Sequence, residues 1–140
     1  MPIFTANVEN NRVIIRVSVE DPAQPDKPLQ VYDALVDTGA TCSMISEQVV
    51  SDFEAERVDT DSFGAANGQV TETDVFALDL RVPVSLSDKQ VLRRGGVRKV
   101  LLMPSPDPAA PPRGYDIILG MDLLVAFAIF MHEGKFTLAI

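Results

Sequence analysis

Cysteine, histidine and net positive charge are scarce in this chain of 140 residues. Its one cysteine, Cys42, excludes an intrachain disulfide and fits a reducing compartment, so we expect a cytoplasmic protein. The formal net charge of -8 argues against nucleic acid or an anionic membrane as the main partner. We expect most of this charge to form a solvated acidic surface.

Long hydrophobic runs and a leader-like start are also missing. The first twelve residues hold no basic segment followed by an apolar run, so we expect no signal peptide. The longest apolar stretch, Leu123 to Met131, is too short to span a bilayer. The length suits one domain with its own core, so we expect a soluble protein with a single domain over residues 1–140.

Short segments with alternating apolar residues predict β-strands. Strands are expected at 12–20, 29–37, 76–82, 97–103 and 115–120, with a terminal hairpin over 128–140 that turns at Glu133-Gly134. Short helices are expected after Ser46, a good helix cap, and after Gly120. Many short strands with little helix predict an all-β fold, a small closed barrel or sandwich.

Two segments are expected to be loops. Pro104–Gly114 is rich in proline, which lacks the backbone donor that a sheet needs. A ligand for a proline-recognising module is the alternative for this segment. Ser87–Gly96 is expected to be a long loop with Arg93 and Arg94 at its solvated tip, although these two residues could instead contact acidic groups of a substrate.

Asp37 directly follows the apolar end of an expected strand, Ala34–Val36. A carboxylate that leaves a buried strand is costly unless it is hydrogen-bonded or paired. Gly39 permits a tight turn there, and Thr38 offers a hydroxyl that can lock the turn. The arrangement therefore suits an acid that must be held in one place. Two such acids sharing one proton can activate a water molecule.

Two motifs resemble the conserved parts of retroviral-type (retropepsin-like) aspartic proteases. The first resembles their active-site loop and reads Asp37-Thr38-Gly39-Ala40. The second resembles their late strand that ends in glycine before a short helix, and reads Ile118-Leu119-Gly120. The resemblance implies the retropepsin-type barrel with one short C-terminal helix, and it assigns Asp37 as the catalytic residue, supported by its three neighbours.

A third segment, between these motifs, resembles the substrate-binding flap of the family. It reads Gly64-Ala65-Ala66-Asn67-Gly68, and Asn-Gly is itself a strong hairpin signal. The two alanines are small, which hints at a roomy cleft. The last residues of the chain resemble the terminal strands of retrotransposon-like single-domain members.

The single Asp-Thr-Gly motif determines the assembly that the resemblance implies. Pepsin-like chains carry two such motifs, whereas this chain carries one. The family therefore implies a homodimer in which Asp37 of each subunit meets the other across a two-fold axis, with Thr38 reaching across to the partner. The implied activity is hydrolysis of a polypeptide substrate by an endopeptidase that needs no metal and no cofactor.

Three positions depart from the family pattern. Pepsin-like sites often have serine where this chain has Ala40, and loss of that hydroxyl predicts activity at mildly acidic pH. Retroviral enzymes carry an acid at the position of Thr41 and an arginine at that of Met121, and these charges support their dimer. Both are missing here, so we expect the apolar terminal hairpin to hold the subunits together.

Other assignments remain open at this stage. The alternative to an enzyme is a catalytically silent dimerisation or peptide-binding module, and the protomers could also stay apart until a partner arrives. Oxidation of Cys42 could hinder dimerisation, but a small buried thiol is the simpler interpretation. His132 is expected at the surface, and Asp122 is expected to cap its helix. The acids of the middle segment lack the spacing of a calcium loop: Asp59, Asp61, Glu72 and Asp74.

Overall fold

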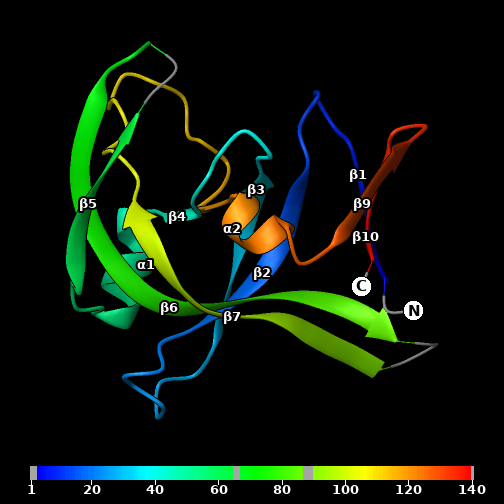
Figure 1. Ribbon diagram of the computed structural model, residues 1–140, viewed down its shortest axis with the longest axis horizontal. Coiled ribbons are helices and arrows are strands. Elements are labelled where there is room, and N and C mark those ends of the chain that lie inside the picture. The colour runs from blue at the N-terminus through cyan, green and yellow to red at the C-terminus, as the bar shows by residue number, and fades with distance from the viewer. Residues whose placement is uncertain (1–2, 65–66, 87–89, 140) are drawn as a thin grey trace.

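The computed structural model describes residues 3–64, 67–86 and 90–139. Strands account for 52% and helices for 9%, which confirms the expected all-β class (Figure 1). The strands are β1 (Ile3–Asn7), β2 (Ile14–Glu20), β3 (Gln30–Val36), β4 (Met44–Ile45), β5 (Asp59–Gly64), β6 (Val70–Leu86), β7 (Gln90–Leu102), β8 (Ile117–Leu119), β9 (Ala128–His132) and β10 (Lys135–Ala139). The helices are α1 (Glu47–Phe53) and α2 (Met121–Leu124).

Six of the strands close into a barrel in the order β2-β3-β8-β4-β7-β6, because β2 also pairs with β6. At one side of the barrel the sheet continues from β6 through β1 and β10 to β9. β5 pairs with the first part of β6 and forms a separate hairpin. In Figure 1 this hairpin and the β9–β10 hairpin lie on opposite sides of α2.

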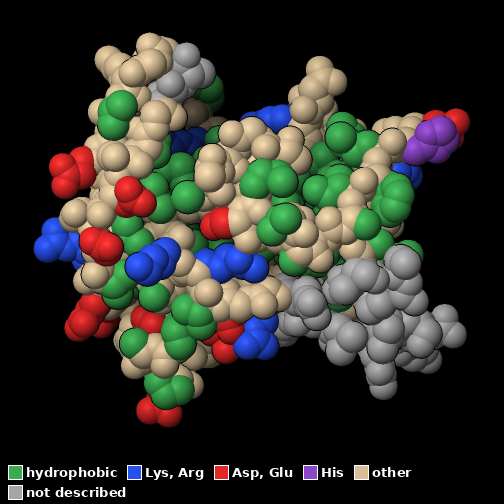
Figure 2. Space-filling model, in the orientation of Figure 1, with side chains coloured by type: hydrophobic (Ala, Val, Ile, Leu, Met, Phe, Trp, Pro, Cys, Tyr) green, Lys and Arg blue, Asp and Glu red, His purple; other side chains and the backbone are tan. Residues whose placement is uncertain are grey.

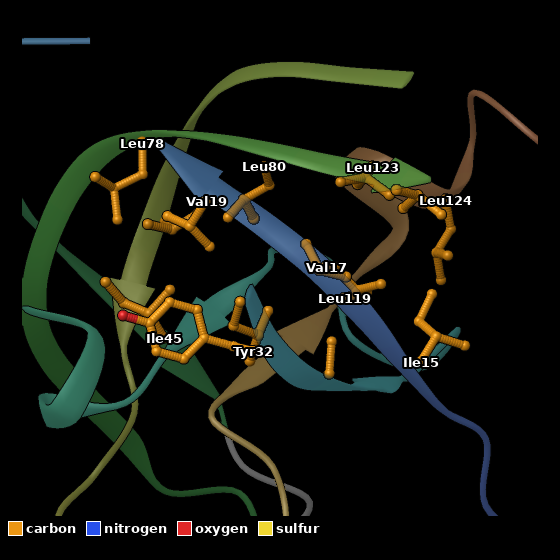
Figure 3. Close-up of a cluster of buried hydrophobic side chains, with 14 of the residues drawn as sticks. Ile15, Val17, Val19, Tyr32, Ile45, Leu78, Leu80, Leu119, Leu123 and Leu124 are labelled. Atoms are coloured by element: carbon orange, nitrogen blue, oxygen red, sulfur yellow. The ribbon is translucent and has the colours of Figure 1, made fainter. Parts of the chain in front are cut away.

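The barrel encloses the hydrophobic core, as the labelled side chains in Figure 3 show. Alternating residues of the strands point inward, and Val17, Val19, Leu78 and Leu80 are fully buried. α2 adds Leu123 to the same cluster. Burying a side chain of this kind stabilises the fold by about 1.5–3 kcal/mol, so the period-two pattern of the sequence is the main source of stability.

The signals for the start of α1 and for the terminal turn are confirmed. Ser46 is the N-cap of α1, and its side chain accepts a hydrogen bond from the amide of Val49. The terminal hairpin turns at Glu133 and Gly134, whose φ angles are 48° and 74°. Residues 104–114 contain no strand. Within the described ranges, neither helix is long and apolar enough to cross a membrane.

The expectation of a loop over Ser87–Gly96 is wrong from Gln90 onward. β7 begins at Gln90 and pairs with β6 as far as Leu101, which makes a hairpin much longer than the apolar alternation indicated. Arg93 and Arg94 are therefore strand residues rather than a loop tip. Residues 87–89, which belong to the same expectation, lie outside the described part of the chain.

Two strands have no counterpart among the expected elements: β1 and β4. β1 is a strand because it inserts between β10 and β6, where Phe4 lies opposite Leu138. β4 is two residues long and pairs with both β7 and β8. Such elements depend on distant partners, so their own residues give little signal.

Candidate active site

Two neighbouring parallel strands bring the two sequence motifs together. β3 and β8 pair with Val36 opposite Leu119, so Asp37 and Gly120 both emerge from the same edge of the barrel. The amide of Asp37 donates a hydrogen bond of 3.0 Å to the carbonyl of Leu119, and the amide of Val36 donates one of 2.9 Å to the carbonyl of Val13, just before β2. Asp37 is thus positioned from both sides by the barrel.

A tight turn then holds the half-buried Asp37 carboxylate. The amide of Gly39 donates to Asp37 Oδ1 at 2.9 Å, and the amide of Ala40 donates to the Asp37 carbonyl at 3.2 Å. A Cβ on Gly39 would lie 3.2 Å from that Oδ1, so glycine allows the close approach. Thr38 is exposed, and its hydroxyl has no hydrogen-bond partner among the described residues, so the two amides close the turn.

The segment after β8 packs directly on this turn. The amide of Met121 donates to the carbonyl of Ala40 at 2.8 Å, and the amide of Asp122 donates to the carbonyl of Thr41 at 3.2 Å. A Cβ on Gly120 would lie 2.7 Å from the carbonyl carbon and oxygen of Cys42. Only glycine permits this approach, which is a physical reason for the glycine in the second motif.

The expectation that Asp122 caps α2 is wrong. Gly120 occupies the N-cap position, and no side chain caps this helix. Asp122 instead reaches across to Ser43, a fully buried residue of the Asp37 loop. Its Oδ1 accepts a 2.7 Å bond from the Ser43 hydroxyl, and its Oδ2 accepts a 3.0 Å bond from the Ser43 amide.

Sequence reasoning missed Ser43 and Arg98 altogether. The hydroxyl of Ser43 also accepts a 3.1 Å hydrogen bond from the amide of Gly120. Arg98, from β7, donates through Nη1 to the carbonyl of Asp122 at 2.6 Å. The only available signal for Ser43 was a small polar residue between apolar ones. Arg98 lies in a segment distant in sequence from both motifs and gave no signal.

The hairpin of β5 and β6 lies beside this loop. Its pairing runs from Asp59 opposite Val75 to Gly64 opposite Val70, which confirms the hairpin expected around Asn67-Gly68. Asn67 accepts a side-chain bond from the amide of Gln69, and Gly68 has a φ of 82°. Ala65 and Ala66, which were assigned to the same substrate-binding segment, lie outside the described residues.

Cys42, in the segment between Asp37 and Ser43, is half-buried. Burial raises the pKa of its thiol, and the charges of Asp122 and Asp61 raise it further. Asp61 belongs to β5, so its influence on Cys42 reflects the proximity of the hairpin to the loop. His132 lies at the far terminal hairpin with a side chain 86% exposed, which excludes a Cys–His pair within the chain.

Apolar side chains gather on the surface next to the loop. Figure 2 shows them over α2 and the adjoining terminal hairpin, whereas charged side chains surround the β5–β6 hairpin. On α2 and just after it, Met121 is 39% and Val125 71% exposed. On β9, Phe130 is 60% and Met131 67% exposed. β9 is also the last strand in the sheet order.

A cavity of about 660 Å³ lies between the start of α1 and the proline loop, and Asp37 is not among its lining residues. Its lining includes Ser46 and Asp116, so it lies at the end of β8 that is opposite to Gly120. The described residues hold no group of three or more acidic, histidine or cysteine side chains suited to a metal ion.

The closed six-stranded barrel with its short helix matches the retropepsin-like fold, and the Asp-Thr-Gly loop lies at the edge of this barrel. The family model described as aspartyl protease matches residues 15–123, and the chain belongs to this family. Its fold is similar to that of a retropepsin-like aspartic protease from Rickettsia conorii. The TM-score is 0.57 with 13% identity, and the match covers 97% of this chain and 89% of that one. A comparison with curated proteins gives no match.

Proposed function

We propose that this protein is a homodimeric aspartic endopeptidase in which Asp37 of each subunit forms half of the catalytic pair. The observation that carries the proposal is the Asp37 carboxylate itself. Asp37 follows the end of β3, which pairs in parallel with β8, and its carboxylate accepts a hydrogen bond of 2.9 Å from the amide of Gly39. In a member of the aspartyl protease family, such a fixed and half-buried carboxylate is suited to act on water.

A second copy of the chain would complete the site. One chain supplies one Asp-Thr-Gly motif, and the loop carrying it borders the apolar surface of α2 and β9. Exposed residues such as Val125, Phe130 and Met131 favour burial against an equivalent surface. This apolar contact would replace the ionic cluster that Thr41 and Met121 cannot form. Exposed Thr38 is free to reach the partner's loop.

The proposed chemistry needs one proton shared by two carboxylates. The ionised Asp37 accepts a proton from the bound water while the water oxygen bonds to the peptide carbonyl carbon. The protonated Asp37 of the other subunit donates a hydrogen bond to the developing oxyanion. As the oxyanion collapses and the C–N bond breaks, this second Asp37 gives its proton to the leaving nitrogen, which yields a carboxylic acid and an amine. The pair again holds one proton, the one taken from the water.

The β5–β6 hairpin is proposed as the flap over an extended substrate. Its glycines, Gly64 and Gly68, flank the tip, and its position beside Cys42 favours a role as one wall of the cleft. A polypeptide in the cleft would add backbone hydrogen bonds like an extra strand. Closure of the hairpin would exclude water from the two carboxylates.

The test compares purified wild type with Asp37→Asn on an unstructured polypeptide at mildly acidic pH. We expect cleavage by the wild type and loss of cleavage in the variant, measured from new amino termini by mass spectrometry. Asp26→Asn, a change of the same kind in the exposed β2–β3 turn, is the matched control and should leave the rate unchanged. Sedimentation gives the oligomeric state of each sample.

A mixing experiment tests the shared site. If random pairing occurs between equal amounts of wild type and Asp37→Asn, only about one quarter of the dimers carry two aspartates. The rate per wild-type chain should therefore fall by about half relative to wild type alone at the same total concentration. An unchanged rate per wild-type chain, with exchange of subunits verified, contradicts the shared pair. A dimer that never cleaves favours the silent module instead.

A further inference from the structure

The link between Ser43 and Asp122 has no role in the chemistry described so far, yet it is one of the few buried polar networks in the fold. Ser43 is fully buried, and its hydroxyl takes part in two hydrogen bonds. It donates to Asp122 Oδ1 at 2.7 Å and accepts from the amide of Gly120 at 3.1 Å. The second oxygen of Asp122 accepts from the amide of Ser43 at 3.0 Å. Each polar group in this chain of contacts has a partner.

These bonds tie both ends of the Asp37 loop to the second motif. At the start of the loop, the amide of Asp37 donates to Leu119. At its end, Ser43 is held by Asp122, and Gly120 packs between the two ends with no room for a Cβ. Backbone bonds alone tie the start. The end is held by backbone bonds, including one of 3.2 Å from the amide of Leu101 to the carbonyl of Ser43, and also by the side chains of Ser43 and Asp122. Loss of the Asp122 side chain would remove two of the bonds that hold this end.

Removal of the Asp122 carboxylate would leave the amide and hydroxyl of buried Ser43 without their acceptors. A buried donor without a partner is unfavourable, so the loop would move until water or another group replaced the carboxylate. Thr41 and Cys42 alone separate Ser43 from the turn of Asp37 to Ala40, so such a movement would be transmitted to the turn. The carboxylate of Asp37 would then be less well oriented toward the water and the substrate.

We propose that Asp122 is a positioning residue for the catalytic aspartate, acting through Ser43. It touches neither substrate nor water. It fixes the end of the loop, and thereby the orientation of the Asp37 carboxylate. The inference rests on the proposed peptidase function, but its structural part concerns the loop alone and is measurable without turnover.

The chain offers a conservative variant and a matched control. In Asp122→Asn the side-chain oxygen can still accept from the Ser43 amide, and the new NH₂ can donate to the Ser43 hydroxyl. The control is a second Ser–Asp pair, in which Ser46 donates to Asp116 Oδ1 at 2.8 Å. Asp116 precedes β8, so it lies at the strand end away from Asp37. Asp116→Ala removes the same chemistry from a place that does not touch the loop.

The experiment measures kcat and KM for wild type, Asp122→Ala, Asp122→Asn and Asp116→Ala. We expect Asp122→Ala to lower kcat at least about tenfold with KM changed less than about threefold, since small misplacements of reacting groups are costly. Asp122→Asn should recover most of the loss, and Asp116→Ala should keep kcat within about twofold. Equal losses of kcat in Asp122→Ala and Asp116→Ala, or no loss in either, would overturn the proposal.

Amide hydrogen exchange separates this inference from the peptidase proposal. In Asp122→Ala, the amides of Asp37 and Gly120 should exchange at least about tenfold faster relative to that of Val19 in the barrel. In Asp116→Ala the exchange rates of these two amides, relative to that of Val19, should not change. If the wild type never cleaves but this pattern is found, the peptidase proposal fails and the anchoring role of Asp122 survives. If the ratio is unchanged in Asp122→Ala, the anchoring role itself fails.

Discussion

The loop of Asp37 and the β5–β6 hairpin differ in burial and hydrogen bonding. The loop and the second motif, residues 37–43 and 117–122, form a platform in which Ser43, Ile117 and Leu119 are fully buried. The hairpin, residues 59–64 and 70–74, forms an arm whose side chains are exposed or at most half-buried. Val70 in the arm is 74% exposed.

This difference shows how one small chain can combine a fixed active-site loop with a hairpin that is able to move. Buried contacts and hydrogen bonds to distant strands give the platform one arrangement. The arm is held mainly by the pairing between its own two strands, so it can open at low free-energy cost. A peptidase of the proposed type needs both properties, because the carboxylate must stay oriented while the substrate enters and leaves.

The largest expected difference comes from adding one methyl group to a glycine in each region. Gly120→Ala would put a Cβ 2.7 Å from the backbone of Cys42, so the platform must shift. We expect the free energy of unfolding to fall by about 1–3 kcal/mol, measured by urea denaturation.

Gly64→Ala is the matched change in the arm, where the described residues place no heavy atom within 4 Å of the new Cβ. We expect the free energy of unfolding to stay unchanged or rise by up to about 1 kcal/mol, because alanine restricts the unfolded chain. Equal destabilisation by the two variants would contradict the contrast between platform and arm.

A smaller effect is expected from Ala40→Ser, which adds a hydroxyl to the platform next to Asp37. A donor that binds the ionised carboxylate favours that form, so the active protonation state should persist to lower pH. The acid limb of the kcat/KM profile should move down by up to about one pH unit, which corresponds to about 1.4 kcal/mol. An identical profile in the variant would refute the assignment of Ala40 beside the catalytic pair.

The smallest expected effect concerns Cys42, at the boundary between the two regions. Because burial, Asp122 and Asp61 raise the pKa of its thiol, a smaller fraction is thiolate at neutral pH than in a free peptide. Alkylation by iodoacetamide should be correspondingly slow and should accelerate only at higher pH.

Asp61→Asn removes one cause of that raised pKa from the arm without altering the Ser43–Asp122 pair. The pKa of the Cys42 thiol should then fall, and alkylation at neutral pH should become faster by less than about threefold, since exposed charges are screened. High salt should remove the difference between wild type and variant. A rate unaffected by Asp61→Asn would show that the arm lies farther from the platform than the structure indicates.

Local signals predicted much of the fold and the two motifs of the candidate site. The period-two patterns indicated the inner strands, Ser46 indicated the start of α1, and Glu133-Gly134 indicated the terminal turn. Asp37 and Gly120 could be assigned because each belongs to a short motif whose residues are neighbours in sequence. The strands β1 and β4 and the full length of β7 could not be predicted, because pairing with distant strands creates them.

The sequence by itself determined which residues turn, which point inward and which acid leaves a buried strand, since these depend on side-chain type and on neighbours along the chain. Only the tertiary structure decided that Asp122 holds Ser43 rather than capping its own helix. It also decided that Arg98 binds the carbonyl of residue 122. The physical reason is that a buried polar group takes whatever partner the packing of distant segments brings within hydrogen-bonding distance.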